Sequence, residues 1–353
     1  MVGAKTTLDR LTSLRAAAAL GVFIVHLSQH NIWRLPANLS SEGYVGVGFF
    51  FTLSGFILVI ATPANDSPLA FYRRRFARIY PAYLAMLLVA LAVPVVPGSR
   101  GPLEVLTSVT LTQSWFPASN SIVYGVNAVS WSLSCEAGFY AVFPFLLVWL
   151  VSKGRRFRWT FAICWYLASA AISVAAVRSH MQFATTAVYV SPLVRLGEFA
   201  LGVVAGVEIA AGWRPRIPIV AVLAVLAALT VATSRAHIPS PLPDFAFDPP
   251  FLALIISAAV LDLSGSRGLL TSRPLIYAGK VSFCFYLVHQ LIIANLKPVL
   301  GGRGLLDALL LLLAACAGAA ALHHLVELPG QRLLRGRQRR PPVDGLAAAP
   351  TQR

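Results

Sequence analysis

Charged residues are scarce in this chain. Asp, Glu, Lys and Arg together make up 12% of its 353 residues, whereas soluble globular proteins carry roughly 25%. Hydrophobic residues account for 57% and the mean hydropathy is +0.72. A composition this apolar over this length excludes a soluble globular domain and predicts an all-α integral membrane protein that crosses the bilayer several times.

Cysteine is also scarce, and its spacing lacks the pattern of a metal site. There are four cysteines and no C-x-x-C pair. Each cysteine lies in an apolar run, so we expect small apolar packing residues rather than disulfides or zinc ligands: Cys135, Cys164, Cys284 and Cys316. We expect no metal site and no permanently bound cofactor.

The first apolar run also lacks an A-x-A cleavage site after it, so we expect it to remain as a membrane span.

Apolar runs of membrane-crossing length recur along the chain. Two of them are short, 80–96 and 250–263. The ten candidate spans are 11–29, 44–62, 80–96, 130–151, 160–177, 192–211, 216–234, 250–263, 275–296 and 304–326. The sequence therefore predicts a bundle of about ten transmembrane helices. We expect one membrane domain over 1–334, followed by a basic and then Pro/Ala-rich disordered cytoplasmic tail at 335–353.

Acidic residues are few compared with basic ones. The chain has 13 Asp and Glu against 29 Lys and Arg, a net charge of +16. With the N-terminus in the cytoplasm, 21 of the basic residues fall in cytoplasmic segments and 6 on the opposite side. This asymmetry is typical of the positive-inside rule. The basic charge therefore predicts a topology with both termini cytoplasmic, and we expect no nucleic-acid partner.

Long loops and internal repeats are also rare. The two long external loops are 97–129 and 235–249. We expect the first, with its apolar patch at 103–111, to be re-entrant or interfacial, and the second to be an ordered proline-rich loop. No internal repeat is apparent, which disfavours a transporter built from repeated halves.

The first span contains two residues that a simple membrane crossing does not need. Arg15 and His26 are 11 residues apart, about three helical turns, so they share one face about 16 Å apart along the axis. Taken singly, Arg15 could snorkel to the helix end and His26 could hydrogen-bond to a neighbouring helix. Together they indicate one cavity along that face, because buried ionisable groups in lipid are costly.

The second span is rich in small residues. Gly46 and Gly48 allow backbones to approach closely, and the Ser54-Gly55 pair predicts a helix break.

The third span is preceded by FYRRRFARIYPAY. Arg75 and Arg78 are three residues apart and share a helix face, with Arg74 beside them. Paired guanidiniums at the cytoplasmic surface can clamp phosphates. The alternative is a positive-inside anchor that binds lipid headgroups.

The fourth span carries a carboxylate, Glu136, with Ser132 one turn before it and Tyr140 one turn after it. A buried carboxylate needs a partner, and Arg15, Arg195 or His26 could supply it. A purely structural ion pair is the alternative.

Three later groups of polar residues are also spaced along helices. Arg195 and Glu198 have i, i+3 spacing, which favours a structural pair. Ser282, Tyr286 and His289 project onto one face of the ninth span. At the end of the tenth span, His324 and Glu327 have the spacing of a metal pair but lack a third ligand, so a helix-end cap is the preferred interpretation.

Taken in order, these motifs resemble one family. They are R-x10-H, GVGFFFTLSGF, RRRFARIYP, WSLSCEAGFY, RLGEFALG, GKVSFCFYLVH and VELP. The sequence resembles acyltransferase family 3, integral membrane O-acyltransferases that modify sugars on polysaccharides, lipopolysaccharide and some antibiotics. The resemblance extends over residues 8–334, nearly the whole chain.

The resemblance implies a location and a set of site residues. It implies a multi-pass protein of the bacterial cytoplasmic membrane that uses a cytoplasmic acyl-CoA, often acetyl-CoA, as co-substrate. The essential histidine of the family maps onto His26, its partnering arginine onto Arg15, and the R-x-x-R pair onto Arg75 and Arg78. The W-S-L-x-x-E-x-x-F-Y motif fits Trp131, Ser132, Leu133, Glu136, Phe139 and Tyr140. We expect substrate-binding residues at Tyr140, Ser132, Trp131, Tyr286 and His289.

The predicted reaction moves an acyl group to a hydroxyl of a sugar-containing acceptor, such as a cell-surface glycan, a glycolipid or a macrolide. Neutral imidazole can serve as base or nucleophile near pH 7; we expect His26 to be the general base, with a covalent acyl-histidine as the variant. Glu136 would orient His26 or neutralise an arginine, and Arg15 or Tyr140 would stabilise the oxyanion. A glycolipid or small-molecule transporter or flippase is the alternative function.

Overall fold

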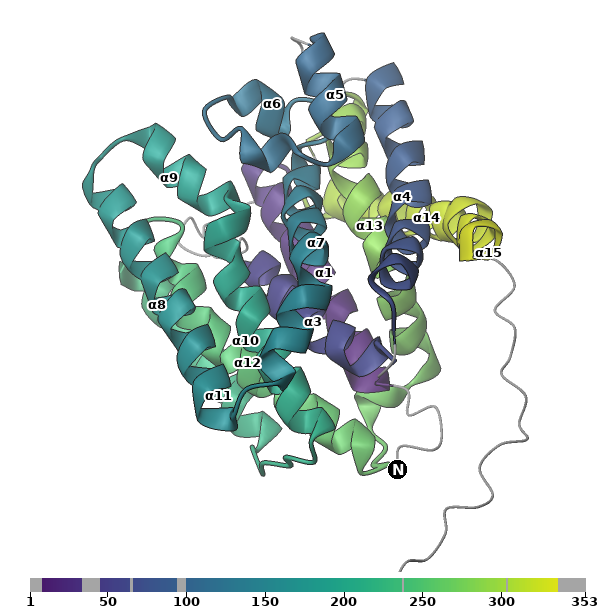
Figure 1. The fold of residues 1–353 in the computed structure, drawn as a ribbon. Helices are drawn as coiled ribbons and strands as arrows, with labels where there is room; N and C mark the ends of the chain where they lie inside the picture. The colour runs from purple at the N-terminus through teal and green to yellow at the C-terminus, as the bar shows by residue number, and fades with distance from the viewer. Residues whose placement is uncertain are drawn as a thin grey trace, which may run out of the picture.

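The structure, a computed structural model, describes residues 8–33, 45–63, 66–93, 100–236, 238–302 and 304–335 (Figure 1). Within these ranges every regular element is a helix and none is a strand. The long helices are α1 (Asp9–Gln29), α3 (Val45–Ala61), α4 (Pro68–Ala92), α7 (Trp131–Val151), α8 (Arg155–Arg178), α10 (Pro192–Ala210), α11 (Ile219–Ala236), α12 (Leu242–Leu263), α13 (Arg273–Leu296) and α14 (Leu305–Leu322). Shorter helices are α5 (Pro102–Thr110), α6 (Asn120–Tyr124), α9 (Gln182–Val190) and α15 (Leu328–Arg335).

Each of the ten predicted spans overlaps one of the long helices. Eight helical segments in the described residues are long and apolar enough to cross a membrane. The apolar helix α3 is slightly shorter, at 17 residues, and α10 carries Arg195, Glu198 and Glu208 within its 19 residues. The protein is therefore an all-α integral membrane protein. Beyond residue 335, the predicted disordered tail lies outside the described residues.

Both spans that looked short in the sequence are longer helices. The run 80–96 belongs to α4, which starts at Pro68, and the run 250–263 belongs to α12, which starts at Leu242. The prediction of a loop over 242–249 was therefore wrong. Both helices contain prolines: Pro81 lies inside α4, and Pro249 and Pro250 lie inside α12. Proline is tolerated in membrane helices because neighbouring groups satisfy the freed backbone.

The long loop before α7 folds back onto α4. The hydroxyl of Tyr80 donates to the carbonyl of Val109 over 3.1 Å, and that of Tyr83 donates to Ser108 over 2.6 Å. The apolar patch 103–111 forms most of α5, and its residues Leu103 and Leu106 are exposed. The re-entrant or interfacial location of this segment stays a prediction.

Glycines bring the backbones of the central helices into contact. In Figure 1, α1 and α3 occupy the centre of the bundle, with α8, α10 and α11 on one side and α4, α13 and α14 on the other. A Cβ at Gly202 of α10 would lie 1.9 Å from the carbonyl oxygen of Thr52, and one at Gly55 of α3 would lie 2.2 Å from that of Phe199. The predicted break at Ser54-Gly55 was wrong, since α3 continues to Ala61. Gly55 instead permits close packing against α10.

A glycine also brings the backbones of α1 and α13 into close contact. A Cβ at Gly279 would lie 1.8 Å from the carbonyl oxygen of Thr12. Because α13 and α3 both pack on α1, the polar face of α1 is enclosed by these two helices.

We predict that Gly202→Ala destabilises the protein by about 1–3 kcal/mol, because the added methyl forces α3 and α10 apart. Thermal unfolding of detergent-purified protein measures the effect. Gly21→Ala in α1 is the matched control, since nothing lies within 4 Å of a Cβ there and alanine favours a helix. Equal melting temperatures for the two variants would contradict the role assigned to Gly202.

Candidate active site

Three arginines and a carboxylate line one cavity in the middle of the bundle, which we call the basic cavity. It has a volume of about 140 Å³ and is lined by residues of five helices. Its polar lining residues are Arg15 of α1, Ser54 of α3, Arg75 and Arg78 of α4, Ser132, Glu136 and Tyr140 of α7, and Ser282 and Tyr286 of α13. Most of the residues predicted from the sequence for donor binding are therefore brought together.

Arg75 and Arg78 lie on one face of α4, as their spacing predicted, and both line the basic cavity. Arg75 stands over the ring of Phe71, 5.6 Å from its centroid. Arg74 differs from them, because its guanidinium forms a bidentate ion pair with Asp66 and does not line the cavity. The predicted role of Arg74 in cofactor binding therefore lacks the placement that Arg75 and Arg78 have.

The carboxylate of Glu136 lies close to hydroxyl groups and to an arginine that line the same cavity. Its Oε2 accepts a hydrogen bond from the Tyr140 hydroxyl over 2.7 Å, and that hydroxyl lies 3.5 Å from the Ser54 hydroxyl. Of the three partners considered from the sequence, only Arg15 lines this cavity with Glu136. The carboxylate therefore balances the positive charge of the basic cavity. It does not orient His26, which lines a different cavity.

His26 opens on a second cavity of about 220 Å³, which we call the histidine cavity. Its lining includes Trp131 of α7, Tyr189 of α9 and Tyr286 and Gln290 of α13. The prediction that Arg15 and His26 line one cavity was wrong, because the wall residues Val47 and Tyr286 separate two neighbouring cavities.

His289 lies behind His26 and determines which of its nitrogens faces the cavity. The Nδ1 of His26 is 2.8 Å from the Nε2 of His289, and the Nδ1 of His289 is 3.2 Å from the carbonyl oxygen of Phe285. A carbonyl only accepts, so Nδ1 of a neutral His289 carries the proton and its Nε2 accepts from Nδ1 of His26. The Nε2 of neutral His26 then presents a lone pair, as a general base requires.

This contact changes the role expected for His289. Its side chain is completely buried and does not line the histidine cavity, so it is placed to orient His26 rather than to bind substrate. The spacing of Ser282, Tyr286 and His289 showed that they share a face of α13, but it did not show that α1 packs on that face.

Tyr286 lies where the two cavities meet. Its hydroxyl is 2.9 Å from the Ser132 hydroxyl and donates to the carbonyl of Val129 over 3.1 Å. Trp131 and Ser132 are neighbours in the chain, yet the first lines the histidine cavity and the second the basic cavity. The hydrogen bonds of Tyr286 with Ser132 and Val129 therefore form a partition between the arginines of the basic cavity and His26 of the histidine cavity.

Arg195 belongs to a separate, fully buried ion cluster. Its guanidinium is 2.6 Å from Glu198 and 2.6 Å from Asp244, and it stacks over the ring of Tyr189 at 4.6 Å. Asp248 is also completely buried, and a Cβ at Gly48 would lie 2.5 Å from its Oδ1. The predicted structural pair of Arg195 and Glu198 is confirmed, and the structure adds the two aspartates of α12.

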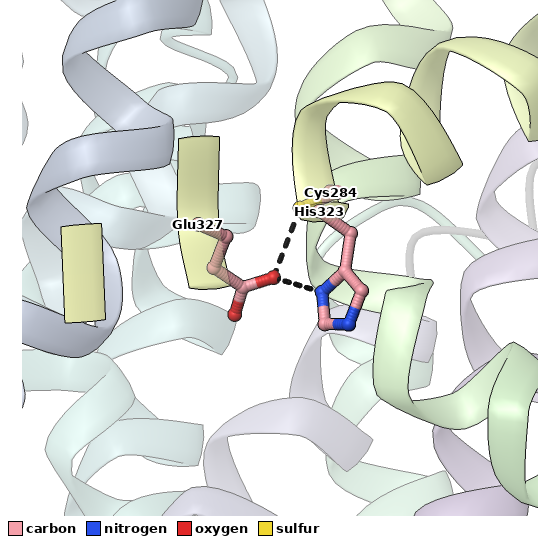
Figure 2. Close-up of side chains that lie close together, drawn as sticks. All are labelled: Cys284, His323 and Glu327. Carbon is pink, nitrogen blue, oxygen red and sulfur yellow. Dashed lines mark hydrogen bonds and ion pairs between the residues drawn. The ribbon is translucent and has the colours of Figure 1, made fainter. Parts of the chain in front are cut away.

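Another buried carboxylate, that of Glu327, contacts His323 and not His324, which was the neighbour expected from the sequence. Its Oε2 lies 2.5 Å from Nδ1 of His323 and 3.1 Å from Sγ of Cys284 (Figure 2). The expected neighbour His324 contacts the Tyr277 hydroxyl instead. The segment His323–Glu327 is a π-helix, and this extra residue per turn brings position 323 rather than 324 next to the carboxylate.

The distances in this cluster fit hydrogen bonds. Ligands bound to one tetrahedral zinc at 2.0–2.2 Å would lie about 3.3–3.6 Å apart, whereas the His323 and Glu327 atoms are 2.5 Å apart. The other oxygen of Glu327 is 2.5 Å from the Arg78 guanidinium and accepts from Gln331 over 3.0 Å. Glu327 therefore holds Arg78 at the edge of the basic cavity, a role that the sequence motif VELP alone did not indicate.

The site defines a class of protein. A histidine with an available ring nitrogen and an arginine-lined cavity adjoin each other inside a membrane bundle, and this arrangement is equipped for group transfer involving an anionic substrate. The chain belongs to the acyltransferase 3 family, since the family model described as an acyltransferase domain matches residues 8–324. It is therefore a membrane acyltransferase, as the motifs predicted.

Two relatives illustrate this membership. The chain is 35% identical to acyltransferase MdmB of Streptomyces mycarofaciens over 370 residues, which cover 94% of this chain and 93% of MdmB. It is 26% identical to O-acetyltransferase OatA of Staphylococcus aureus over 163 residues, which cover 41% of this chain and 26% of OatA. No solved structure matches the chain significantly.

We predict that Arg195→Ala destabilises the protein by about 3–5 kcal/mol, because it leaves Glu198 and Asp244 buried without a counter-charge. Chemical or thermal unfolding in detergent measures the loss. Arg155→Ala is the control: Arg155 is half exposed and lies 3.6 Å from Glu208, so its removal costs below about 1 kcal/mol. A stable, fully folded Arg195→Ala protein would refute the structural role of the cluster.

Proposed function

We propose that the protein transfers an acyl group, with acetyl as the reference case, from cytoplasmic acyl-CoA to a hydroxyl of a sugar-containing acceptor. His26 acts as the general base. The hydrogen-bonded pair of His26 and His289 carries this proposal, because it leaves Nε2 of His26 free to accept a proton in the histidine cavity.

The basic cavity supports an anionic donor. Arg75 and Arg78 lie at the end of α4 that the charge distribution assigns to the cytoplasm, and Glu327 holds Arg78 in place. Guanidiniums pair well with phosphate oxygens, and CoA presents phosphates from the cytoplasm. The thioester end of the donor would extend past Glu136 and Tyr140 toward Tyr286, which lines both cavities.

The reaction needs one proton transfer in each direction. Nε2 of His26 takes the proton from the acceptor hydroxyl while that oxygen attacks the thioester carbonyl. The carbon–sulfur bond then breaks, and the CoA sulfur leaves with the proton from His26. The hydroxyl of Tyr286 lies at the boundary between donor and base, so it is better placed than Arg15 or Tyr140 to hydrogen-bond to the developing oxyanion. Its one proton would turn from the carbonyl of Val129 to the oxyanion, and the Ser132 hydroxyl would still donate to that carbonyl.

The relatives support the choice of acceptor atom and location. OatA is named an O-acetyltransferase, and the same chemistry here would acylate a hydroxyl. Both relatives are bacterial, which supports placement in a bacterial cytoplasmic membrane. We propose a cell-surface glycan, a glycolipid or a glycosylated small molecule such as a macrolide as acceptor. Mass spectrometry of such acceptors, incubated with membranes and labelled acetyl-CoA, identifies the one that is used.

We predict that His26→Ala lowers kcat by about 10²–10⁴-fold, the usual contribution of a general base, while expression and thermal stability stay close to those of the wild type. The measurement is labelled acyl transfer by purified protein at saturating substrates. Substantial residual activity would refute the assignment of His26.

His289 provides a matched pair of variants for the same test. His289→Gln keeps an amide oxygen that can accept from Nδ1 of His26, whereas His289→Leu removes the acceptor. We expect Gln to retain more kcat than Leu, with similar KM values in both, because His289 acts by orienting the base. Mass spectrometry of the protein after incubation with acetyl-CoA alone separates the base mechanism, with no adduct, from an acyl-histidine.

We predict that Arg75→Ala raises the KM for acyl-CoA at least about tenfold, the loss of one charged hydrogen bond, and leaves the KM for the acceptor little changed. Arg78 needs a double variant, Arg78→Gln with Glu327→Gln, because Arg78 also neutralises a buried carboxylate. Arg74→Ala is the control, since Arg74 pairs with Asp66 outside the cavity. A larger effect on the acceptor than on acyl-CoA would refute the donor site.

The transporter alternative makes opposite predictions. A flippase would move a glycolipid or small molecule without acylating it and would not consume acyl-CoA. Membership of an acyltransferase family favours the enzyme, and release of free CoA by purified protein in the presence of acceptor separates the two functions.

A further inference from the structure

A third cavity adjoins the basic cavity and has no role in the function described so far. It has a volume of about 300 Å³ and lies between α4 and α7 beside the end of α5. We call it the side cavity. Its lining is almost entirely apolar or aromatic and comprises Tyr72, Arg75, Phe76, Ile79, Tyr80, Leu111, Leu133, Ala137, Tyr140 and Ala141.

The side cavity adjoins the basic cavity and shares part of its wall with it. Arg75, Ile79, Leu133 and Tyr140 line both of them. Leu133 follows Ser132, whose hydroxyl bonds to Tyr286 at the partition. Leu133 therefore lies between a group held near that partition and the side cavity, and it is the side chain that an acyl chain would have to pass.

The polar atoms of its lining tyrosines are already satisfied. The Tyr72 hydroxyl donates to the carbonyl of Ala141 over 2.8 Å, and the Tyr80 hydroxyl donates to that of Val109 over 3.1 Å. The Tyr80 ring stacks on Phe76 with centroids 4.5 Å apart. These rings present carbon to the cavity, so an occupant gains from burial of apolar surface rather than from hydrogen bonds.

Two alanines on one face of α7 make the space. Ala137 and Ala141 are one helical turn apart and line the side cavity, but neither lines the basic cavity. A larger side chain at position 137 would fill the side cavity and leave the predicted phosphate and thioester path untouched.

We propose that the side cavity binds the hydrocarbon chain of the donor, so that the enzyme accepts and favours acyl-CoA with a chain longer than acetyl. This inference rests on the proposed acyl-CoA donor. With CoA phosphates at Arg75 and Arg78, the chain leaves the carbonyl near Tyr286 and turns past Leu133 between α4 and α7. Each buried methylene then strengthens binding by about fourfold, until the cavity is full.

The test uses non-hydrolysable S-alkyl-CoA thioethers, so that it needs no acceptor. Dissociation constants for S-ethyl-, S-butyl- and S-hexyl-CoA are measured by calorimetry on the full-length protein in lipid nanodiscs. For the wild type we expect Kd to fall about fourfold per added methylene. For Ala137→Phe we expect S-ethyl-CoA to bind within about twofold of wild type and the gain with chain length to disappear.

Val142→Phe is the matched control, because it adds the same ring to an exposed position of α7 that does not line the side cavity. It should keep the wild-type dependence on chain length. If Kd does not depend on chain length in the wild type, or if Ala137→Phe retains the dependence, bilayer lipid fills the cavity and the inference is wrong. If none of the thioethers binds to the wild type, the proposed acyl-CoA donor itself is wrong, a result distinct from binding without chain-length dependence.

Discussion

A charge buried in this bundle must find its counter-charge on another part of the protein, because lipid supplies neither water nor ions. Arg10 of α1 pairs with Asp262 of α12 over 2.9 Å, and Arg78 of α4 pairs with Glu327, which follows α14, over 2.5 Å. Arg195 of α10 joins Asp244 of α12. Each pair connects helices that are distant in the chain, so the charges that are costly in lipid also specify which helices are neighbours. The positions of the side chains that line the basic and histidine cavities depend on this requirement.

The cost of buried charge also explains why the candidate site consists of two cavities, one basic and one with a neutral lining. Positive charge is collected in the basic cavity, where Glu136 offsets part of it, and His26 is kept apart in a cavity whose polar lining is neutral. An imidazole close to several guanidiniums would be a weaker base, because a second positive charge beside them is unfavourable. The Tyr286–Ser132 hydrogen bond lies between the two regions. The proposed donor binding and proton abstraction would therefore take place in adjoining but electrostatically different surroundings.

His26 is held in place by neutral groups, whereas the buried arginines of the bundle are held in place by ion pairs. His289 accepts from His26 and is itself oriented by a backbone carbonyl of its own helix. This relay has the logic of a catalytic triad, in which a third group fixes the tautomer of the base, but it uses a carbonyl in place of a carboxylate. In an apolar interior a neutral orienting group avoids the cost of burying another charge.

The sequence was enough to predict the fold class, the approximate positions of the long helices, and several of the residues that line the two cavities. Hydrophobic runs and helical spacing are local properties, so they correctly placed Arg75 with Arg78 and Glu136 with Tyr140. Tertiary structure alone decided which residues meet from different helices: His289 with His26, Glu327 with Arg78, and Asp244 with Arg195. It also decided that Arg15 and His26 face separate cavities, because Tyr286 of α13 and Val47 of α3 come between them. Such contacts depend on how helices pack and on a π-turn at His323–Glu327, and the periodicity of a single helix does not encode either.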